Sequence, residues 1–376
     1  MNWPARWAAT ASRWTGTAEP DRTTATLAPE TTINEGSAMR PRLPRALALL
    51  LVLALPGCER IQNAALDAMV KDHTDQSLIQ GGNGIRVILC GTGTPQANAT
   101  RGQACTLVAA GGRLFLFDAG ENAMRNLETS HVPAQALNQV FITHWHSDHF
   151  NGLGALINHS WIYGRQTPFL VFGPPGVEQV VEGLAMAYAQ DAGYRSAHAL
   201  PPTDKQLAFA EPRRVEIAEG QESVRVYDQG GVTIDAYRVD HHPVEPAYGY
   251  VLRYQGKKLF ISGDTRVSER YLEAMRDADL VVHEAINAHL VREGAAALER
   301  TGQPDRGAQA VRVLDYHADT LELARMAQRA GVRHLLLTHL IPAPDDFLAR
   351  RLFVSGMADE YSGEITLGED ALDLSL

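Results

Sequence analysis

Three histidines and one aspartate fall within the six residues His144-Trp145-His146-Ser147-Asp148-His149. This HxHxDH pattern includes the last residue of QVFITH, an apolar run that predicts a buried strand at 139–144. A tight turn at a strand end can direct alternate side chains toward one ion and the next pair toward another. Imidazole and carboxylate ligands suit zinc, with manganese and iron as alternatives. The pattern therefore predicts a metal site, because a solvated polar loop rarely collects four such residues by chance.

The segments on either side of this motif alternate between strand-like and helix-like patterns. Strands are predicted at 85–90, at 105–120 as a pair joined by Gly111-Gly112, at 169–176, and in VTIDAYRVDH, GYVLRYQGKKLFISGD, LVVHEA and HLLLTHL. Helices are predicted over 122–131, 153–162, 177–192 and 319–332, the last with a glycine stop. This succession predicts a layered α/β fold.

These motifs, in this order, resemble the metallo-β-lactamase superfamily over about residues 84–342. The aspartate of LFDAGEN, Asp118, is similar to the first acidic motif of the family, which lies behind the metal loop. The resemblance implies a four-layer αβ/βα sandwich with one or two metals at the sheet edges. The carboxyl end after residue 342 is short and could complete this fold in another way.

The resemblance also implies the ligands, residue by residue. His241 in VDHHPVEPAYGY is preferred to His242 because family members commonly place the ligand first. Metal one would take His144, His146 and His241, metal two would take Asp148, His149 and His339, and Asp264 of ISGDT would bridge them. Each ligand is expected to follow the end of a predicted strand. The expected cofactor is a pair of Zn²⁺ ions, with Mn²⁺ or iron as alternatives.

Two further elements resemble the ribonuclease Z branch, which also contains arylsulfatase-like and cyclic-nucleotide phosphodiesterase-like enzymes. Gly91-Thr92-Gly93-Thr94-Pro95 is similar to its GTG turn, and His283-Glu284-Ala285 with His317-Ala318-Asp319-Thr320 is similar to its HEAT and HST elements. The second histidine of that pair is not a ligand in this branch. The resemblance implies that His317 donates to the reacting oxyanion, that Glu284 fixes its tautomer, and that Asp148 also orients the water. The alternative for His317 is a helix-start residue near solvent.

The implied activity is hydrolysis of an ester by a hydroxide that bridges two divalent ions. A phosphodiester or an aryl sulfate is the expected substrate. The alternatives are a lactonase or β-lactamase on the same fold, and a non-catalytic lipoprotein that retains the site. Lactam and lactone chemistry does not require a histidine such as His317, and a non-catalytic protein does not require all seven ligand positions to be filled.

The charge balance argues against nucleic acid as a partner. The chain has 34 Lys and Arg against 44 Asp and Glu, a net charge of −10. Nucleic-acid binding favours clustered basic residues. The region 177–230, where transfer-RNA processing enzymes carry a basic arm, has one basic pair, Arg213-Arg214, flanked by Glu211 and Glu216. The sequence therefore predicts a small-molecule ester as substrate, and it leaves room for a homodimer.

The amino end has the pattern of an export signal. Three arginines in MRPRLPR, from Met39, precede the apolar run Ala46 to Leu55, which is too short for the roughly 20 residues that span a bilayer. The following Leu55-Pro56-Gly57-Cys58 resembles a bacterial lipobox. This resemblance implies that a lipid on Cys58 anchors the protein on the periplasmic side of a bacterial membrane. An ordinary cleaved signal or a short buried helix is the alternative.

The expected organisation has four segments. Residues 1–38 are an extension from a misplaced start codon or a disordered segment, 39–57 are the signal peptide, 58–83 are a tether, and 84–376 are the metallo-hydrolase domain. Removing residues 1–57 leaves 28 basic and 40 acidic residues, a net charge of −12.

Two cysteines remain after Cys58. A hairpin could bring Cys90 and Cys105 together, and the oxidising periplasm permits a disulfide. Free buried cysteines are common, so the sequence leaves both states open.

Overall fold

The computed structural model describes residues 62–67, 77–80, 84–198 and 204–376. The predicted signal segment 39–57 and Cys58 lie outside these residues, as does part of the predicted tether. The described residues from Asn63 onward form one compact unit, which contains all the strands described below. None of the described helices is long and apolar enough to span a membrane.

The described strands form two seven-stranded sheets. In the first sheet the order is β14-β1-β2-β3-β4-β5-β6. Its strands are β1 (Ile85–Gly91), β2 (Cys105–Ala110), β3 (Arg113–Phe117), β4 (Gln139–Phe141), β5 (Phe169–Gly173), β6 (Ala210–Arg214) and β14 (Asp373–Ser375). Pairing is antiparallel from β14 to β3 and parallel from β3 to β6.

The second sheet repeats this arrangement in the order β13-β12-β11-β10-β9-β8-β7. Its strands are β7 (Ser223–Gln229), β8 (Val232–Arg238), β9 (Tyr248–Tyr254), β10 (Lys257–Ile261), β11 (Leu280–Ile286), β12 (His334–Ile341) and β13 (Glu364–Leu367). Pairing is antiparallel from β7 to β10 and parallel from β10 to β13. The carboxyl end thus supplies an edge strand to each sheet, β13 to one and β14 to the other.

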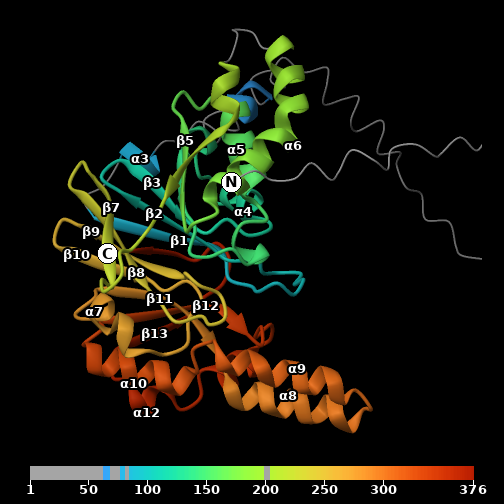
Figure 1. Ribbon diagram of the computed structural model, residues 1–376, viewed down its shortest axis with the longest axis vertical. Helices are drawn as coiled ribbons and strands as arrows, with labels where there is room; N and C mark the ends of the chain where they lie inside the picture. Colours follow the sequence, from blue (N-terminus) through green and yellow to red (C-terminus); the bar gives the residue numbers. More distant parts are fainter. Residues whose placement is uncertain (1–61, 68–76, 81–83, 199–203) are drawn as a thin grey trace, which may run out of the picture. The chain divides into compact units, whose positions relative to one another are not determined.

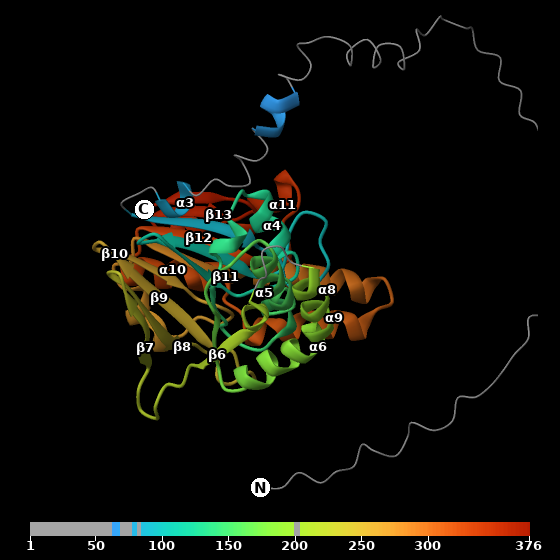
Figure 2. The ribbon, with the colours of Figure 1, turned by 90° about the horizontal axis from the view of Figure 1, so that it is seen from above.

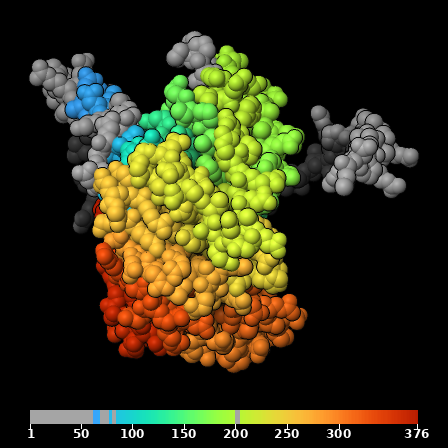
Figure 3. Space-filling model, turned by 60° about the vertical axis from the view of Figure 1, so that its left-hand side comes forward, coloured from blue at the N-terminus to red at the C-terminus, as the bar shows by residue number. Residues whose placement is uncertain are grey.

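Helices cover the outer faces of both sheets (Figure 1). The first sheet carries α4 (Ala123–Thr129), α5 (Leu153–Ile162) and α6 (Val177–His198), and the second carries α7 (Leu272–Met275), α10 (Thr320–Ala330) and α12 (Met357–Glu360). Figure 3 shows one face of the molecule. The second sheet, in yellow, lies there between the yellow-green last part of the first sheet and its helices and the orange-to-red helices of the second half. The expected four-layer αβ/βα sandwich is confirmed.

Alternation along the strands explains why this sandwich has three apolar layers. In β3, Phe115 and Phe117 face the core between the sheets, whereas Leu114 and Leu116 face the helices. Successive side chains of a strand point to opposite faces, so a strand that is apolar at every position must be covered on both sides. After Arg113, the remaining four residues of β3, LFLF, have this composition.

Most predicted elements lie within a few residues of the observed ones. Helix α5 has the predicted bounds, and α10 is capped by Asp319, whose side chain accepts from Leu321 N and Glu322 N. The predicted strand at 139–144 was too long, because β4 ends at Phe141 and the chain then turns into the metal loop. The predicted helix at 177–192 was too short, because α6 continues to His198.

A helical hairpin that the sequence patterns did not predict joins β11 to the His317 segment. It consists of α8 (Ala288–Arg300) and α9 (Pro304–Arg312), which lie side by side and extend away from the sheets (Figures 1 and 2). Two further short helices are α3 (Ser77–Gln80) and α11 (Phe347–Phe353).

The two cysteines whose state was left open form a disulfide. The Cα atoms of Cys90 and Cys105 are 4.9 Å apart, within the range that a disulfide bridges. Cys90 lies at an irregularity in the β1–β2 pairing, where Leu89 pairs with Thr106 and Gly91 with Cys105. The bond therefore links two strands beside the GTG turn.

Candidate metal centre

The HxHxDH loop lies between the end of β4 and α5. It packs against Asp118-Ala119-Gly120, the three residues that follow β3. Ala119 N donates to the carbonyl of His149 at 2.8 Å, and Gly152 N donates to the carbonyl of Ala119 at 2.7 Å. A Cβ on Gly120 would lie 2.3 Å from the Asp148 carbonyl oxygen, which is too close for any residue other than glycine. The glycine lets the two backbones touch, so the loop is held by main-chain contacts.

The seven predicted ligands converge at this point. Two groups have ligand atoms within 4.8 Å of one another: His144, His146, His241 and Asp264 form one, and Asp148, His149 and His339 form the other. This division matches the division between metal one and metal two that the family resemblance implied. His241 is buried, whereas the side chain of His242 is 77% exposed, so the choice between these neighbours agrees with the geometry.

Asp264 lies at the centre of the cluster. Its Oδ2 atom is 3.3 Å from His149 Nε2, 3.4 Å from His339 Nε2, and 3.9 Å from the Nε2 atoms of both His144 and His241. One carboxylate therefore faces imidazoles from both groups. This is the position from which a single aspartate can contact two ions.

Six of the seven ligand positions lie in the loops that follow three strand ends, as expected, but His339 does not. His144 follows β4, His241 follows β8 and Asp264 follows β10. His339 lies within β12, at a bulge where Glu284 pairs with Thr338 and Ala285 with Leu340. Its φ of 44° is in the left-handed region, which L-residues rarely adopt. The bulge re-aims the side chain from inside the strand, which the expectation of a ligand after the strand did not include.

Hydrogen bonds fix the rings of three histidines from behind. The Nδ1 atom of His149 bonds to Asp118 Oδ2 at 2.7 Å, that of His241 to the Tyr316 carbonyl at 3.0 Å, and that of His144 to Thr143 Oγ1 at 3.0 Å. Such contacts leave Nε2 facing inward and are usual around metal-bound imidazoles.

Thr143 and Tyr316 were missed as supporting residues. Each directly precedes a predicted site residue in the chain, His144 and His317, and this adjacency was the only available signal.

Burial keeps three of the imidazoles neutral. Loss of solvent lowers the pKa of His146 and His241, and it lowers the pKa of His144 well below the usual value. A neutral imidazole has the lone pair that a metal requires. These residues are therefore in the protonation state of ligands at neutral pH.

Carboxylates raise the pKa of two other histidines of the cluster, His339 and His149. Burial disfavours a charge on His339, but Asp264 and Asp148 outweigh it and raise the pKa of His339 to about 9. Asp264 and Asp118 likewise raise the pKa of the buried His149 well above its usual value. The positive charge of His339 and His149 in turn holds the pKa of Asp264 well below normal, against its burial. The cluster therefore favours added positive charge at its centre.

Buried polar atoms without a hydrogen-bond partner lie at the same point. They include His144 Nε2, His149 Nε2 and Asp264 Oδ1. A buried polar atom without a partner costs free energy, and a divalent cation would satisfy all three. The residues present therefore fit a metal centre in donor type, burial and charge.

His317 and Glu284 form a buried pair beside the cluster. His317 Nδ1 donates to Glu284 Oε1 at 2.8 Å, and the same oxygen accepts from Thr265 N at 2.8 Å. His317 also groups with Asp264 and His339 as a possible ligand set, so geometry alone allows it to contact metal or substrate. Both ring nitrogens of His283 bond to groups away from the cluster: Nδ1 to the Glu284 carbonyl and Nε2 to Tyr271 Oη.

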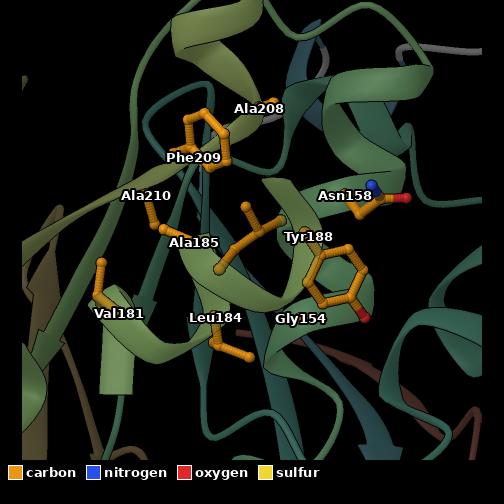
Figure 4. Close-up of a pocket in the computed structure, with 10 residues that line it drawn as sticks. Gly154, Asn158, Val181, Leu184, Ala185, Tyr188, Ala208, Phe209 and Ala210 are labelled. Carbon is orange, nitrogen blue, oxygen red and sulfur yellow. The ribbon is translucent and has the colours of Figure 1, made fainter. Parts of the chain in front are cut away.

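The apolar pocket in Figure 4 lies apart from this cluster, between α5, α6 and the start of β6. Its lining includes Val181, Leu184, Tyr188 and Phe209 and none of the residues of the metal centre. It plays no part in the chemistry considered below.

Comparisons with known proteins agree with the fold and show the family. The family model of the anti-Pycsar protein Apyc1 matches residues 85–334. Ribonuclease Z of Mycobacterium sp. (strain KMS) is 35% identical over 294 residues, covering 76% of this chain and 94% of that protein. The chain belongs to the Apyc1 family and, with ribonuclease Z, to the metallo-β-lactamase-fold hydrolases. Ribonuclease Z of Mycobacterium marinum (strain ATCC BAA-535 / M) is 31% identical over 297 residues, covering 76% of this chain and 96% of that protein.

Two solved structures have the same fold. YhfI from Bacillus subtilis aligns with a TM-score of 0.56 and 19% identity, over 78% of this chain and 100% of that one. The short form of human tRNase Z aligns with a TM-score of 0.56 and 23% identity, over 77% and 98%. The family model covers six of the seven proposed ligands, and His339 lies beyond it. The protein is thus a hydrolase of this fold whose His and Asp cluster could bind metal.

Proposed function

We propose that this protein is a zinc-dependent phosphodiester hydrolase with two ions in its centre. The observation that carries the proposal is the position of Asp264, whose Oδ2 is within 3.9 Å of the Nε2 atoms of four histidines from both ligand groups. Nitrogen and oxygen donors in this mixture suit zinc. Membership of a family that includes ribonuclease Z supports a phosphodiester as the bond that is cleaved.

Two divalent ions held by these residues would activate a water and neutralise the charge that develops on the ester. Asp148, whose Oδ2 is 3.2 Å from His339 Nε2, would orient that water. His317 would donate a proton to the departing oxygen from Nε2, because its Nδ1 is held by Glu284. The Glu284 carboxylate, which accepts from Nδ1 at 2.8 Å, keeps the ring in one tautomer and one orientation. Lactone and lactam hydrolysis does not require such a histidine, so this pair supports a phosphodiester over those substrates.

A small ester fits the surface charges better than a nucleic acid. The basic pair in the region between the metal loop and His241 is neutralised by neighbours: Arg213 bonds to Glu211 at 2.6 Å, and Arg214 bonds to Glu178 at 2.9 Å. Arginines that are already paired with carboxylates bind a phosphate backbone weakly, because that binding depends on basic groups that replace the counterions of the phosphates.

A substrate panel tests the proposal. The protein is stripped of metal, loaded with Zn²⁺, and assayed against bis(4-nitrophenyl) phosphate, 4-nitrophenyl sulfate, nitrocefin and a structured precursor RNA. We expect zinc-dependent hydrolysis of the phosphodiester that is lost in Asp264→Asn and retained in His242→Ala, the neighbour of a ligand. Turnover of the sulfate or of nitrocefin in place of the phosphodiester would overturn the bond assignment, and cleavage of the RNA alone would overturn the small-substrate assignment.

A further inference from the structure

Among the imidazoles nearest Asp264, His339 is held differently from its neighbours. His144, His149 and His241 each have Nδ1 fixed by a hydrogen bond, whereas Nδ1 of His339 is buried without a partner. Its ring lies between those of His149 and His317, with centroids 5.3 and 5.5 Å away. No side chain among the described residues therefore holds this ring from behind by a bond at Nδ1, so the backbone at the β12 bulge has a larger part in setting its orientation.

The residue after His339 shows what holds this backbone. Leu340 N donates to the carbonyl oxygen of Thr92 at 3.1 Å, at the point where the bulge interrupts the β11–β12 register. Thr92 is the central residue of the GTG turn after β1 and is fully buried. The turn thus contacts the second sheet one residue away from a predicted ligand.

Three hydrogen bonds to the side chains of Asp370 and Arg101 hold Thr92 in place. Its N and Oγ1 both donate to Asp370 Oδ1, at 3.0 and 2.7 Å, and its Oγ1 accepts from Arg101 Nη1 at 2.7 Å. The other oxygen of Asp370 accepts from Gly102 N at 2.6 Å and Asn126 Nδ2 at 2.8 Å. The Asp370 carboxylate therefore ties the turn to both the loop after it and α4.

The glycines of the turn permit this approach. A Cβ on Gly91 would lie 1.7 Å from the Gln103 carbonyl oxygen, and one on Gly93 would lie 2.9 Å from that of Gly102. The turn and residues 101–103 are thus in direct backbone contact. The carbonyl of Thr92 is presented to Leu340 by a rigid support.

We infer that Thr92, held by Asp370 and Arg101, is a positioning residue for His339 and thereby for the metal-two half of the centre. The inference rests on the proposed binuclear centre and assigns the GTG turn a role in ligand geometry. A positive φ at His339 persists only where its surroundings enforce it, and the bond from Leu340 N to Thr92 is one such restraint. Loosening the support should let the ring leave the Asp148 and Asp264 oxygens.

Stepwise zinc titration of the metal-free protein tests this inference. Thr92→Val removes the hydroxyl at nearly constant volume, and Thr92→Ser restores it. We expect Thr92→Val to weaken binding of the second ion roughly 10- to 100-fold, the usual effect of losing an outer support of a ligand, with the first ion unchanged. Thr92→Ser should bind both ions as wild type does.

Asp279→Asn is the matched control. Asp279 is also a largely buried carboxylate; it accepts from Lys258 N at 2.9 Å and bonds to Lys257 and Arg333 just before β11 begins. The Asp279→Asn substitution should lower the melting temperature without changing the affinity for either ion. Asp370→Asn, which keeps the shape of the side chain, gives the same titration if Thr92→Val does not fold.

The outcomes separate this inference from the proposed function. Two ions bound at wild-type affinity by Thr92→Val or Asp370→Asn would overturn the role of the turn and leave the centre intact. Equal weakening of both ions would also overturn it, because that is the effect of a general structural defect. A wild-type protein that binds no more than one zinc would overturn the binuclear centre itself.

Discussion

At the scale of single residues, the two adjacent histidines after β8 differ in what surrounds them. His241 is buried, and its Nε2 is 3.3 Å from His146 Nδ1. The side chain of His242 is 77% exposed, and its Nδ1 is 3.7 Å from Glu245 Oε1. His241→Ala should therefore remove one bound zinc and abolish most activity, whereas His242→Ala should leave both unchanged. Metal analysis of the two variants checks this, and a loss of zinc in His242→Ala would show that the ligand is misassigned.

Protonation of the cluster predicts that metal binding depends on pH. The pKa of His339 is raised to about 9 by Asp264 and Asp148, so the metal-free protein carries a proton there at pH 7. A cation must displace that proton, and raising the pH removes this cost. We expect zinc affinity to increase from pH 6 toward about pH 9 and then to level off.

Calorimetry in buffers of different ionisation enthalpy measures the protons released on binding. We expect at least one proton per chain at pH 7, since His149 also has a raised pKa in the absence of metal. His339→Ala should release fewer protons than wild type. An affinity that does not change between pH 6 and pH 9 would contradict this account of the charges.

At the scale of elements, the disulfide closes the β1–β2 segment over a sequence separation of 15 residues. Restricting a loop of this length in the unfolded chain stabilises a fold by about 3 kcal/mol. Cys90→Ala with Cys105→Ala should lower the free energy of unfolding by roughly that amount, as measured by urea unfolding without reductant. The same loss should follow when dithiothreitol is added to the wild type. Equal stability of the oxidised and reduced wild-type protein would mean that the bond does not constrain the unfolded chain.

The elements that position the ligands were predicted where the apolar pattern is continuous. QVF, LLLTHL and LVVHEA are buried strands in apolar layers, and such runs are visible without any structure. The HxHxDH spacing is likewise local, so the metal loop could be identified directly. These features depend only on neighbours in the chain.

The remaining features depend on contacts between distant parts of the chain. The bulge at His339 is a property of β11 and β12 together, and the Asp370–Thr92 bond joins residues 278 positions apart. The α8–α9 hairpin contributes few residues to the core: only Ala288, Val291 and Ala295 are buried in α8, and Gly307 in α9. Short edge strands such as β13 and β14 are also defined by their partners.

At the scale of the whole molecule, the amino-terminal segment predicts where the protein acts. We propose that the chain is exported and anchored by a lipid on Cys58, and the disulfide supports this because such bonds persist in oxidising compartments. Cys58→Ser should move the protein from the membrane fraction to the soluble periplasmic fraction. Fractionation followed by mass spectrometry of the amino terminus measures this. A variant that stays as firmly bound to membranes as the wild type would contradict the anchor.

The central claim is that His317 acts on the substrate beside a two-metal centre and does not bind metal. Held by Glu284, it should protonate the departing oxygen, so its loss should matter most for a poor leaving group. The most direct measurement determines the zinc content of His317→Ala together with kcat for an alkyl and a nitrophenyl phosphodiester. The account predicts two zinc ions per chain and a fall in kcat of roughly 10²- to 10⁴-fold on the alkyl ester, with a smaller fall on the nitrophenyl ester. Loss of zinc from His317→Ala, or near-normal turnover of the alkyl ester, would contradict it.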